Sequence, residues 1–215
     1  MIPLVHDFEG ETVVVFGGGP VGARRARRFA AEADVVVVSP AFDAGDYGGA
    51  RRVRADPSPE DVHEWVERTD PALVVAATDD DAVNEAAATA AQEAGALANR
   101  ADEAGERDAG HVVVPATVRD DPVAVSVTTG GTSPALAREL RRRIETELDG
   151  AGAMAALTGD LRADLRDRGL PRSARRDALR AVVASDAVWK ALRTGEPNAR
   201  KEAESVIEDS LEGSA

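Results

Sequence analysis

The sequence predicts an α/β protein with a doubly wound parallel sheet, followed by a small β-containing segment and a helical carboxyl-terminal domain. Uninterrupted apolar runs such as "TVVVF" (12–16) and "DVVVV" (34–38) are typical of strands that a parallel sheet buries on both faces. Helical stretches separate these runs, which favours right-handed crossovers. Beyond residue 110 apolar and polar residues alternate instead, which indicates a second sheet with one open face.

The amino-terminal half carries the signals of alternating strands and helices. The run "PALVVAA" is a further buried strand, a Pro-, Gly- and Asp-rich loop fills residues 39–49, and Gly95 ends an alanine-rich helix. We expect strands at Thr12–Phe16, Asp34–Val38, Arg51–Arg54, Pro71–Ala77 and Ala96–Asn99, and helices at Val21–Ala33, Pro59–Arg68 and Asp80–Ala94.

The carboxyl-terminal half begins with strands and continues as helices. Strands are expected at His111–Val118 and Val123–Thr128, joined by a turn at residues 120–122. Ser133 is a good N-cap with Pro134 at the first helical position, and the pattern is helical from Ala151 onward. These changes of pattern predict three domains: residues 1–112, 113–148 and 149–215.

The composition narrows the class of protein. The 215 residues include no cysteine, which excludes disulfides and thiolate chemistry, and the formal net charge is −13. Such a chain repels phosphates, so nucleic-acid binding is not expected. No signal peptide and no apolar run of roughly 18 residues is seen, so a cytoplasmic protein without membrane contact is expected. Abundant acids with scarce lysine favour a halophilic source over an ordinary acidic protein.

The turn after the first strand, Gly17 to Gly22, fits the pattern G-x-G-x-x-G. Gly17 permits a tight turn, Gly19 lets the backbone approach a pyrophosphate, and Gly22 lets the helix pack close to the strand. The helix amino terminus then presents N–H groups and a partial positive charge to the diphosphate. In this strand–turn–helix context the pattern predicts dinucleotide binding. A glycine turn that serves only the geometry of the sheet is the alternative.

The end of the second strand bears on the choice of cofactor. It reads Ser39-Pro40, without the acidic residue that commonly binds the ribose of NAD. Asp43 is near enough in sequence to reach a ribose hydroxyl, and no Arg or Lys follows directly to bind a 2′-phosphate. These residues favour NAD over NADP.

Four stretches together resemble the precorrin-2 dehydrogenase family of siroheme biosynthesis, which includes the amino-terminal module of bacterial siroheme synthases. They are "GGGPVGARRA" (17–26), "AATDDDAVN" (76–84), "NRAD" (99–102) and "TTGGTSPALARELR" (128–141). The resemblance implies a Rossmann domain and a homodimer that pairs through the middle segment, residues 113–148. It also implies NAD-dependent oxidation of precorrin-2 to sirohydrochlorin.

The resemblance assigns positions to the cofactor and to the chemistry. It identifies Asp102 with the essential aspartate of the family, which suits a base that takes up a proton during the oxidation. Capping of a helix or turn that begins at Glu103 is the alternative. The expected cofactor ligands are Gly17, Gly18, Gly19, Pro20, Val21 and Gly22 at the diphosphate, Ser39, Pro40, Ala41 and Phe42 near the ribose, and Ala77 and Thr78 after the fourth strand.

Precorrin-2 carries eight carboxylates, so an acidic enzyme needs local basic groups to bind it. Arginine binds a carboxylate through two N–H groups at once. Arg100, Arg119 and Arg138 are therefore candidate substrate ligands, with Thr128 where bacterial synthases have the first serine of "SSGG". The run of arginines at residues 141–143 is better explained as a solvated face that offsets neighbouring acids.

No metal site is expected. The aspartates at residues 79–81 directly precede a helix, where capping and the helix dipole explain them better than a bound cation does. The three histidines lack the spacing of zinc ligands. Of these, His111 begins a predicted strand, so a structural role is favoured over a substrate contact.

Two other functions remain open. A bifunctional dehydrogenase and ferrochelatase would use the same cleft and the same aspartate. A regulatory NAD-sensing module is the alternative of another class, although such modules lack the "GGTSP" segment found here. The chain has no room for the methyltransferase module of the fused synthases, so we expect a separate enzyme to supply the substrate.

Overall fold

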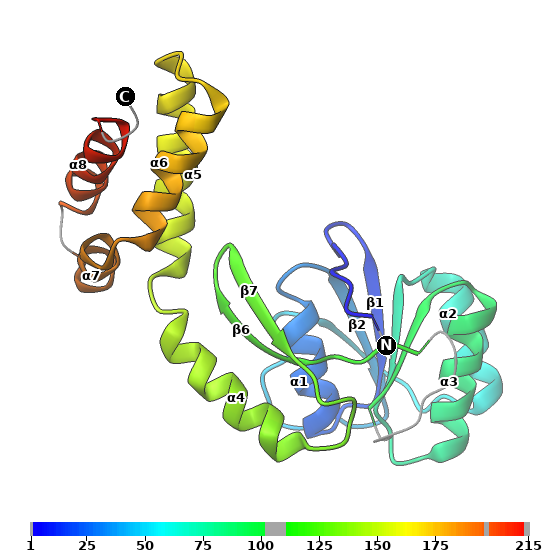
Figure 1. The fold of residues 1–215 in the computed structure, drawn as a ribbon. Coiled ribbons are helices and arrows are strands. Elements are labelled where there is room, and N and C mark those ends of the chain that lie inside the picture. Colours follow the sequence, from blue (N-terminus) through cyan, green and yellow to red (C-terminus); the bar gives the residue numbers. More distant parts are fainter. Residues whose placement is uncertain (1, 102–110, 196–197, 213–215) are drawn as a thin grey trace. The chain divides into compact units, whose positions relative to one another are not determined.

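The computed structural model describes residues 2–101, 111–195 and 198–212, and Figure 1 shows its helices and strands. The chain divides into two compact units. The first comprises Met1–Val114 with Gly130–Thr132, and the second comprises Pro115–Thr129 with Ser133–Ala215. The finer division into three domains stays a prediction.

The first unit is built on one parallel sheet with the strand order β3-β2-β1-β4-β5. The central strand pairs on both sides, so that Val14 lies opposite Val36 of one neighbour and Val74 of the other. This order confirms the predicted doubly wound sheet. The strands are β1 (Thr12–Phe16), β2 (Asp34–Ser39), β3 (Arg51–Arg54), β4 (Leu73–Ala76) and β5 (Leu97–Arg100).

Helices cover both faces of this sheet, as Figure 1 shows. One face, with Val14 and Val74, packs against α2 (Pro59–Thr69) and α3 (Asp81–Glu93). The other face, with Val13, Val15 and Val75, packs against α1 (Pro20–Phe29). Because neighbouring residues of a strand point to opposite faces and both faces are buried, the strands are apolar throughout.

The predicted helix Val21–Ala33 is longer than α1, which ends at Phe29. Beyond that point the N–H groups of Glu32 and Ala33 both donate to the Phe29 carbonyl, at 3.0 and 2.8 Å. The N–H of Asp34 then donates to the Glu11 carbonyl at 2.9 Å, which starts β2. The chain has to turn there to reach the sheet, and this requirement overrides the helical preference of the sequence.

Side chains cap the helices of the first unit. Ser58 and Asp61 form a capping box at α2, in which the Ser58 N–H donates to the Asp61 carboxylate at 2.8 Å. This bond, together with the Ser58 hydroxyl, lowers the pKa of Asp61. At α3 the Asp80 carboxylate accepts from the N–H groups of Ala82 and Val83, at 2.8 and 3.2 Å. The predicted capping role is therefore confirmed for Asp80.

The strand predicted at His111–Val118 is wrong in its first half. His111 makes only an isolated parallel bridge to Ala98 of β5, and the next strand starts at Ala116. The N–H of Val112 donates to the Ala98 carbonyl at 2.7 Å, but residues 112–115 form no strand. Pro115 has no N–H to give to a sheet, so the ladder is not continued through it.

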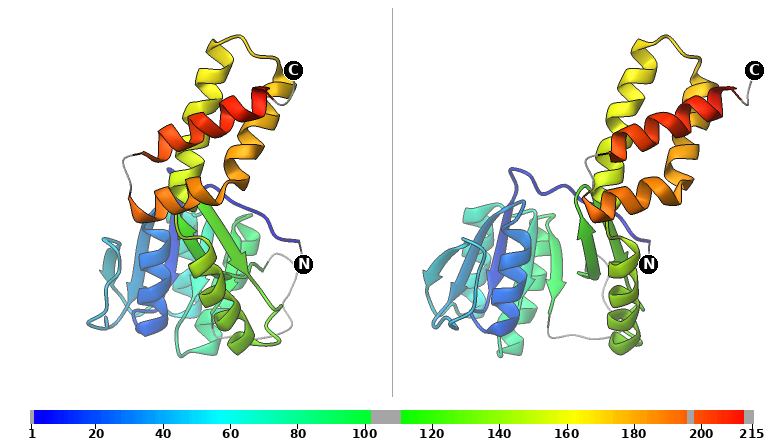
Figure 2. Two further views of the ribbon diagram at one scale, coloured as in Figure 1. Left: turned by 60° about the vertical axis from the view of Figure 1, so that its left-hand side comes forward. Right: turned by 90° about the vertical axis from the view of Figure 1, so that its left-hand side faces the viewer.

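The second unit combines an antiparallel hairpin with five helices in its described residues. α4 contacts both hairpin strands, and α5 to α8 enclose a separate core that includes Leu161, Leu165, Val182 and Ile207. Figure 2 shows these last four helices from two further sides. The elements are β6 (Ala116–Asp120), β7 (Val123–Val127), α4 (Pro134–Glu147), α5 (Ala151–Asp167), α6 (Arg172–Ala184), α7 (Asp186–Thr194) and α8 (Ala199–Glu212).

Two glycines of α5, one packed and one in open space, allow a controlled test of how α5 packs on the hairpin turn. The Gly152 N–H donates to the Asp120 carboxylate at 2.9 Å, and a Cβ at residue 152 would lie 2.4 Å from the Asp121 carbonyl oxygen. Nothing lies within 4 Å of a Cβ at Gly159. Gly152→Ala is expected to lower the free energy of unfolding by about 1–3 kcal/mol, because backbone must move. Gly159→Ala should raise it by roughly 0.5–1 kcal/mol.

The measurement is urea unfolding at neutral pH, followed through Trp189 fluorescence in a Trp65→Phe background. Trp189 belongs to the core of the same unit. Equal stabilities of the two alanine variants would contradict the close packing of α5 on the hairpin turn.

Candidate functional site

The turn between β1 and α1 requires glycine at its first and last positions. Gly17 has a φ of 114°, and a Cβ there would lie 2.2 Å from the Ala77 carbonyl oxygen. A Cβ at Gly22 would lie 1.9 Å from the Gly17 carbonyl oxygen. The turn therefore passes against the end of β4, and α1 packs directly on the turn. These contacts agree with the tight turn and the close packing predicted for the two residues.

The second glycine is fixed by the loop that follows β2. A Cβ at Gly18 would lie 2.2 Å from the Ala41 carbonyl oxygen. The Gly18 carbonyl accepts from the buried Tyr47 hydroxyl at 2.5 Å and from the Asp43 N–H at 2.8 Å. Tyr47 also stacks edge-on against Phe42, with 5.9 Å between ring centroids. The turn and the loop thus hold each other in place.

Gly19 differs from the other three glycines, because nothing lies within 4 Å of the position of a Cβ there. It is the N-cap of α1, with extended backbone, and it faces a cavity of about 660 Å³. The first-turn N–H groups of a helix have no acceptor within the helix, and they carry a partial positive charge. Open space at this point has the form that a bound diphosphate needs.

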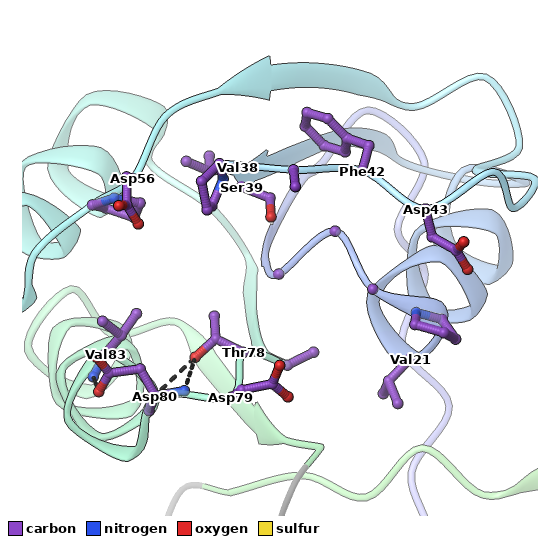
Figure 3. A pocket seen from close by; sticks show the side chains of 18 residues that line it. Val21, Val38, Ser39, Phe42, Asp43, Asp56, Thr78, Asp79, Asp80 and Val83 are labelled. Atoms are coloured by element: carbon purple, nitrogen blue, oxygen red, sulfur yellow. Dashed lines mark hydrogen bonds between the residues drawn. The ribbon is translucent and has the colours of Figure 1, made fainter.

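The cavity lies at the carboxyl ends of β1, β2 and β4, where ligands of doubly wound sheets bind. Figure 3 shows the residues that line it around the glycine turn. All the predicted cofactor ligands except Gly22 belong to its lining, which also includes Val38, Asp43, Asp56, Pro57, Asp79, Asp80 and Val83. The structure therefore brings four separate stretches of sequence to one cavity.

A buried amide holds the loop after β4 in shape. Asn84 of α3 is fully buried, and its side chain accepts from the Thr78 hydroxyl at 2.8 Å and from the Thr78 N–H at 3.1 Å. It also donates to the Thr78 carbonyl at 3.0 Å. The roles of Asn84 and of Tyr47 in positioning the cavity wall were not foreseen. The motif "AATDDDAVN" contained Asn84, but spacing alone does not show which atoms a side chain will contact.

The charged side chains that line the cavity all have one sign. Among the described residues, Asp43, Asp56, Asp79 and Asp80 line it, and the lining includes no Arg or Lys. Within this lining, positive potential for a phosphate comes from the amino terminus of α1 rather than from side chains. Instead of an acid at the end of β2, the lining has Asp43 from the next loop and Asp56 from the segment after β3. Asp56 was not foreseen.

The predicted substrate ligands are spread over both units. Arg100 lies in β5, is 8% exposed, and pairs with Glu85 of α3 at 2.5 Å. Arg119 in β6 is exposed and lies 3.8 Å from the Asp121 carboxylate. Thr128 follows β7 and Arg138 lies on α4, both exposed. Asp102, the predicted base, lies outside the described residues, two positions after the end of β5.

Among the described residues of the first unit, the buried atoms Asn99 Oδ1 and His111 Nδ1 have no hydrogen-bond partner. Asn99 uses its other side-chain atom, Nδ2, to donate to the Val112 carbonyl at 2.8 Å. In the part of the chain that the structure describes, no three His, Cys, Asp or Glu side chains gather as metal ligands would. Within the same residues, every helix is too short or too polar to cross a membrane.

Comparison with protein families gives two matches. The family model described as "Putative NAD(P)-binding" matches residues 4–116, and the model of the "Sirohaem biosynthesis protein central" segment matches residues 120–147. Together they cover the sheet, the cavity, most of the hairpin and α4. They agree with the resemblance that the four stretches of sequence indicated.

Individual relatives point the same way. The chain is 29% identical to a precorrin-2 dehydrogenase from Methanosarcina barkeri over 98% of its own length and 95% of the relative. It is 33% identical to a siroheme synthase from Azotobacter vinelandii, over its whole length but 45% of the synthase. With a siroheme synthase from Stutzerimonas stutzeri the identity is 34%, over 78% of this chain and 36% of the synthase. The chain thus spans less than half of these synthases.

Among solved structures, SirC, a precorrin-2 dehydrogenase, has the same fold. The TM-score is 0.70 with 23% identity, and the match covers 97% of this chain and all of SirC. The fold, the cavity and the family matches lead to one conclusion. The chain belongs to the family that comprises precorrin-2 dehydrogenases and the NAD(P)-binding part of siroheme synthases.

Proposed function

We propose that this protein is an NAD-dependent precorrin-2 dehydrogenase that produces sirohydrochlorin for siroheme synthesis. The reaction removes two hydrogens from precorrin-2: a hydride passes to NAD⁺, giving NADH, and a proton passes to a base. Family membership and the near full-length match to the M. barkeri dehydrogenase support this assignment. The fold shared with SirC is consistent with it.

The observation that carries the proposal is the cavity at the glycine turn. Its open space beside Gly19, the amino terminus of α1 and the loops after β2 and β4 fit the diphosphate and ribose of a dinucleotide. NAD supplies the hydride acceptor when it is bound. The chain itself holds the diphosphate at the turn and keeps the loops rigid through Tyr47 and Asn84.

Asp102 is the base of the proposed reaction. The carboxyl end of β5 lies beside the carboxyl end of β4, because Ala76 and Arg100 are paired in the parallel sheet. Asp102 follows this end by two residues in the sequence, and ligands of doubly wound sheets bind at this edge, where the strands end. A carboxylate at that edge is suited to receive the proton that leaves the macrocycle as the hydride is transferred.

The active protein is proposed to be a homodimer that pairs through the middle segment. From Ala116 to Glu147 the single buried residue is Val118, so neither the hairpin nor α4 belongs to a core within the chain. Leu136 of α4 is 50% exposed. A hairpin and a helix of this length are seldom stable without an apolar face that is covered. A second copy of the same segment would supply the cover.

Gly19→Ala separates the binding role of the turn from its folding role. Since a Cβ at Gly19 meets no protein atom, the variant should fold with unchanged stability. The added methyl group should occupy space that the diphosphate needs, and NAD affinity should fall at least tenfold. Isothermal titration with NAD, beside thermal unfolding without ligand, measures both. Unchanged NAD affinity would place the diphosphate elsewhere.

The four carboxylates that line the cavity predict a preference for NAD over NADP. A 2′-phosphate near Asp43 and Asp56 would meet like charges with no arginine or lysine in the lining, so NAD should bind at least tenfold more tightly than NADP. Asp43→Asn/Asp56→Asn should reduce this preference to a few-fold. Glu64→Gln/Glu67→Gln, the same charge change on exposed positions of α2, is the control and should preserve it.

The dissociation constants for this comparison are measured at about 0.1 M salt, where screening still leaves short-range repulsion. A preference for NADP in the unaltered protein would refute the roles given to the two aspartates.

Anaerobic turnover of precorrin-2 with NAD tests the function itself, with NADH and sirohydrochlorin followed by absorbance. The unaltered protein should be active. Asp102→Asn should lose at least a hundredfold in kcat while it keeps its affinity for NAD, because the amide cannot take up a proton. Asp46→Asn, at an exposed loop position, is the matched control. A folded, NAD-binding protein without turnover would refute the proposed reaction, and full activity of Asp102→Asn would refute the base.

A further inference from the structure

A groove beside α5 and α6 in the second unit gathers arginine side chains. It has a volume of about 980 Å³, and among the residues that the structure describes no Asp or Glu lines it. The chain as a whole has a formal net charge of −13, whereas the charged residues that line this groove are all arginines. Its lining consists of Arg162, Arg172, Arg175, Arg176 and Arg180 with Thr158, Ser173, Leu179, Val183 and Ala184.

Arginines on neighbouring α4 are paired with acids. Arg142 and Arg143 both donate to Glu139, which lowers the pKa of that carboxyl to about 2, and Arg141 pairs with Glu145 at 3.1 Å. This confirms the solvated face predicted for residues 141–143. Such pairs neutralise each other on the helix surface, and they leave little charge to attract a ligand.

The groove differs from α4 because its arginines outnumber the carboxylates that pair with them. Arg176 and Arg180 share one carboxylate, Asp177, at 3.3 and 3.6 Å. Arg162 and Arg172 are exposed and make no ion pair with any residue in the described ranges. A concentration of unpaired guanidinium groups is a site for an anion that bears several negative charges.

Arg175 provides a second, independent sign that a ligand belongs there. Its Nε atom is buried and has no hydrogen-bond acceptor among the residues that the structure describes. Buried donors are nearly always satisfied, and an unsatisfied donor costs on the order of 1–3 kcal/mol. An anion in the groove would bring the acceptors that the protein itself does not provide.

Apolar side chains complete the groove and indicate the kind of anion. Leu179 and Val183 lie on α6 among the arginines, and Val183 is 46% exposed. A small inorganic anion gains nothing from such contacts, whereas an anion with a large apolar body buries them. The volume, about 980 Å³, is at the upper end of ordinary ligand sites.

We propose that this groove binds a polycarboxylate tetrapyrrole, through Arg162, Arg172 and Arg175 on its carboxylates and through Leu179 and Val183 on its macrocycle. The proposal rests on the proposed function, because that function supplies a ligand with eight carboxylates around an apolar ring. Guanidinium groups hold carboxylates through paired N–H bonds, and the ring covers the exposed apolar side chains.

The test uses uroporphyrin III, a stable fluorescent porphyrin with eight carboxylates, titrated with the full chain at about 0.15 M salt. Arg162→Glu/Arg172→Glu should weaken binding at least tenfold, measured by fluorescence anisotropy. Arg166→Glu/Arg168→Glu, exposed positions outside the groove lining, changes the net charge by the same amount and should alter affinity less than twofold. Citrate at the same concentration should not displace the porphyrin.

Two other binding results overturn the proposal. Equal weakening by both double variants would show attraction by net charge alone, and displacement by citrate would show a general anion site. NAD affinity and turnover, measured on the same samples, separate this inference from the proposed function. Turnover with identical porphyrin affinity in all three proteins would refute the groove alone. Groove-dependent porphyrin binding without NAD-dependent turnover would refute the dehydrogenase alone.

Discussion

The first unit depends on one close backbone approach, between Gly17 and the Ala77 carbonyl, where any side chain would overlap the end of β4. This contact lets the chain leave β1 and enter α1 without moving away from the sheet. Gly22 repeats the constraint one helical turn later, against the turn itself. With the turn held so tightly, the amino terminus of α1 points into the cavity at the edge of the sheet, and Gly19 is left with free space in front of it.

The two units provide positive potential by different physical means. At the glycine turn, backbone N–H groups and the helix dipole face a cavity whose charged side chains are all acidic. This arrangement is the basis of the proposed binding of a diphosphate and of the expected preference for NAD over NADP. In the helical unit the positive charge comes from guanidinium groups, which are suited to several separate carboxylates. The two proposed sites therefore provide local positive potential in a protein whose total charge is strongly negative.

The sequence predicted the geometry of the glycine turn better than the contacts that hold the cavity wall. Gly17, Gly19 and Gly22 follow from a short local pattern, since the geometry of a strand–turn–helix unit is the same wherever it occurs. Tyr47 and Asn84 could not be found in this way. Each acts through a hydrogen bond to a residue that a separate segment supplies, and only the packing of α3 and of the loop after β2 brings donor and acceptor together.

By itself the sequence determined the alternation of strands and helices, the glycine turn, and the family, because apolar periodicity and short motifs are local properties. Tertiary structure decided where α1 stops, that His111 makes only a bridge, and that Asp56 joins the wall of the cavity. It also decided which arginines pair with acids. Glu139 neutralises Arg142 and Arg143 from the same helix, whereas α5 and α6 bring Arg162 and Arg172 to one groove, where no acid of the described ranges pairs with either. Charge pairing depends on distances in space, which spacing along a chain predicts only within one helix.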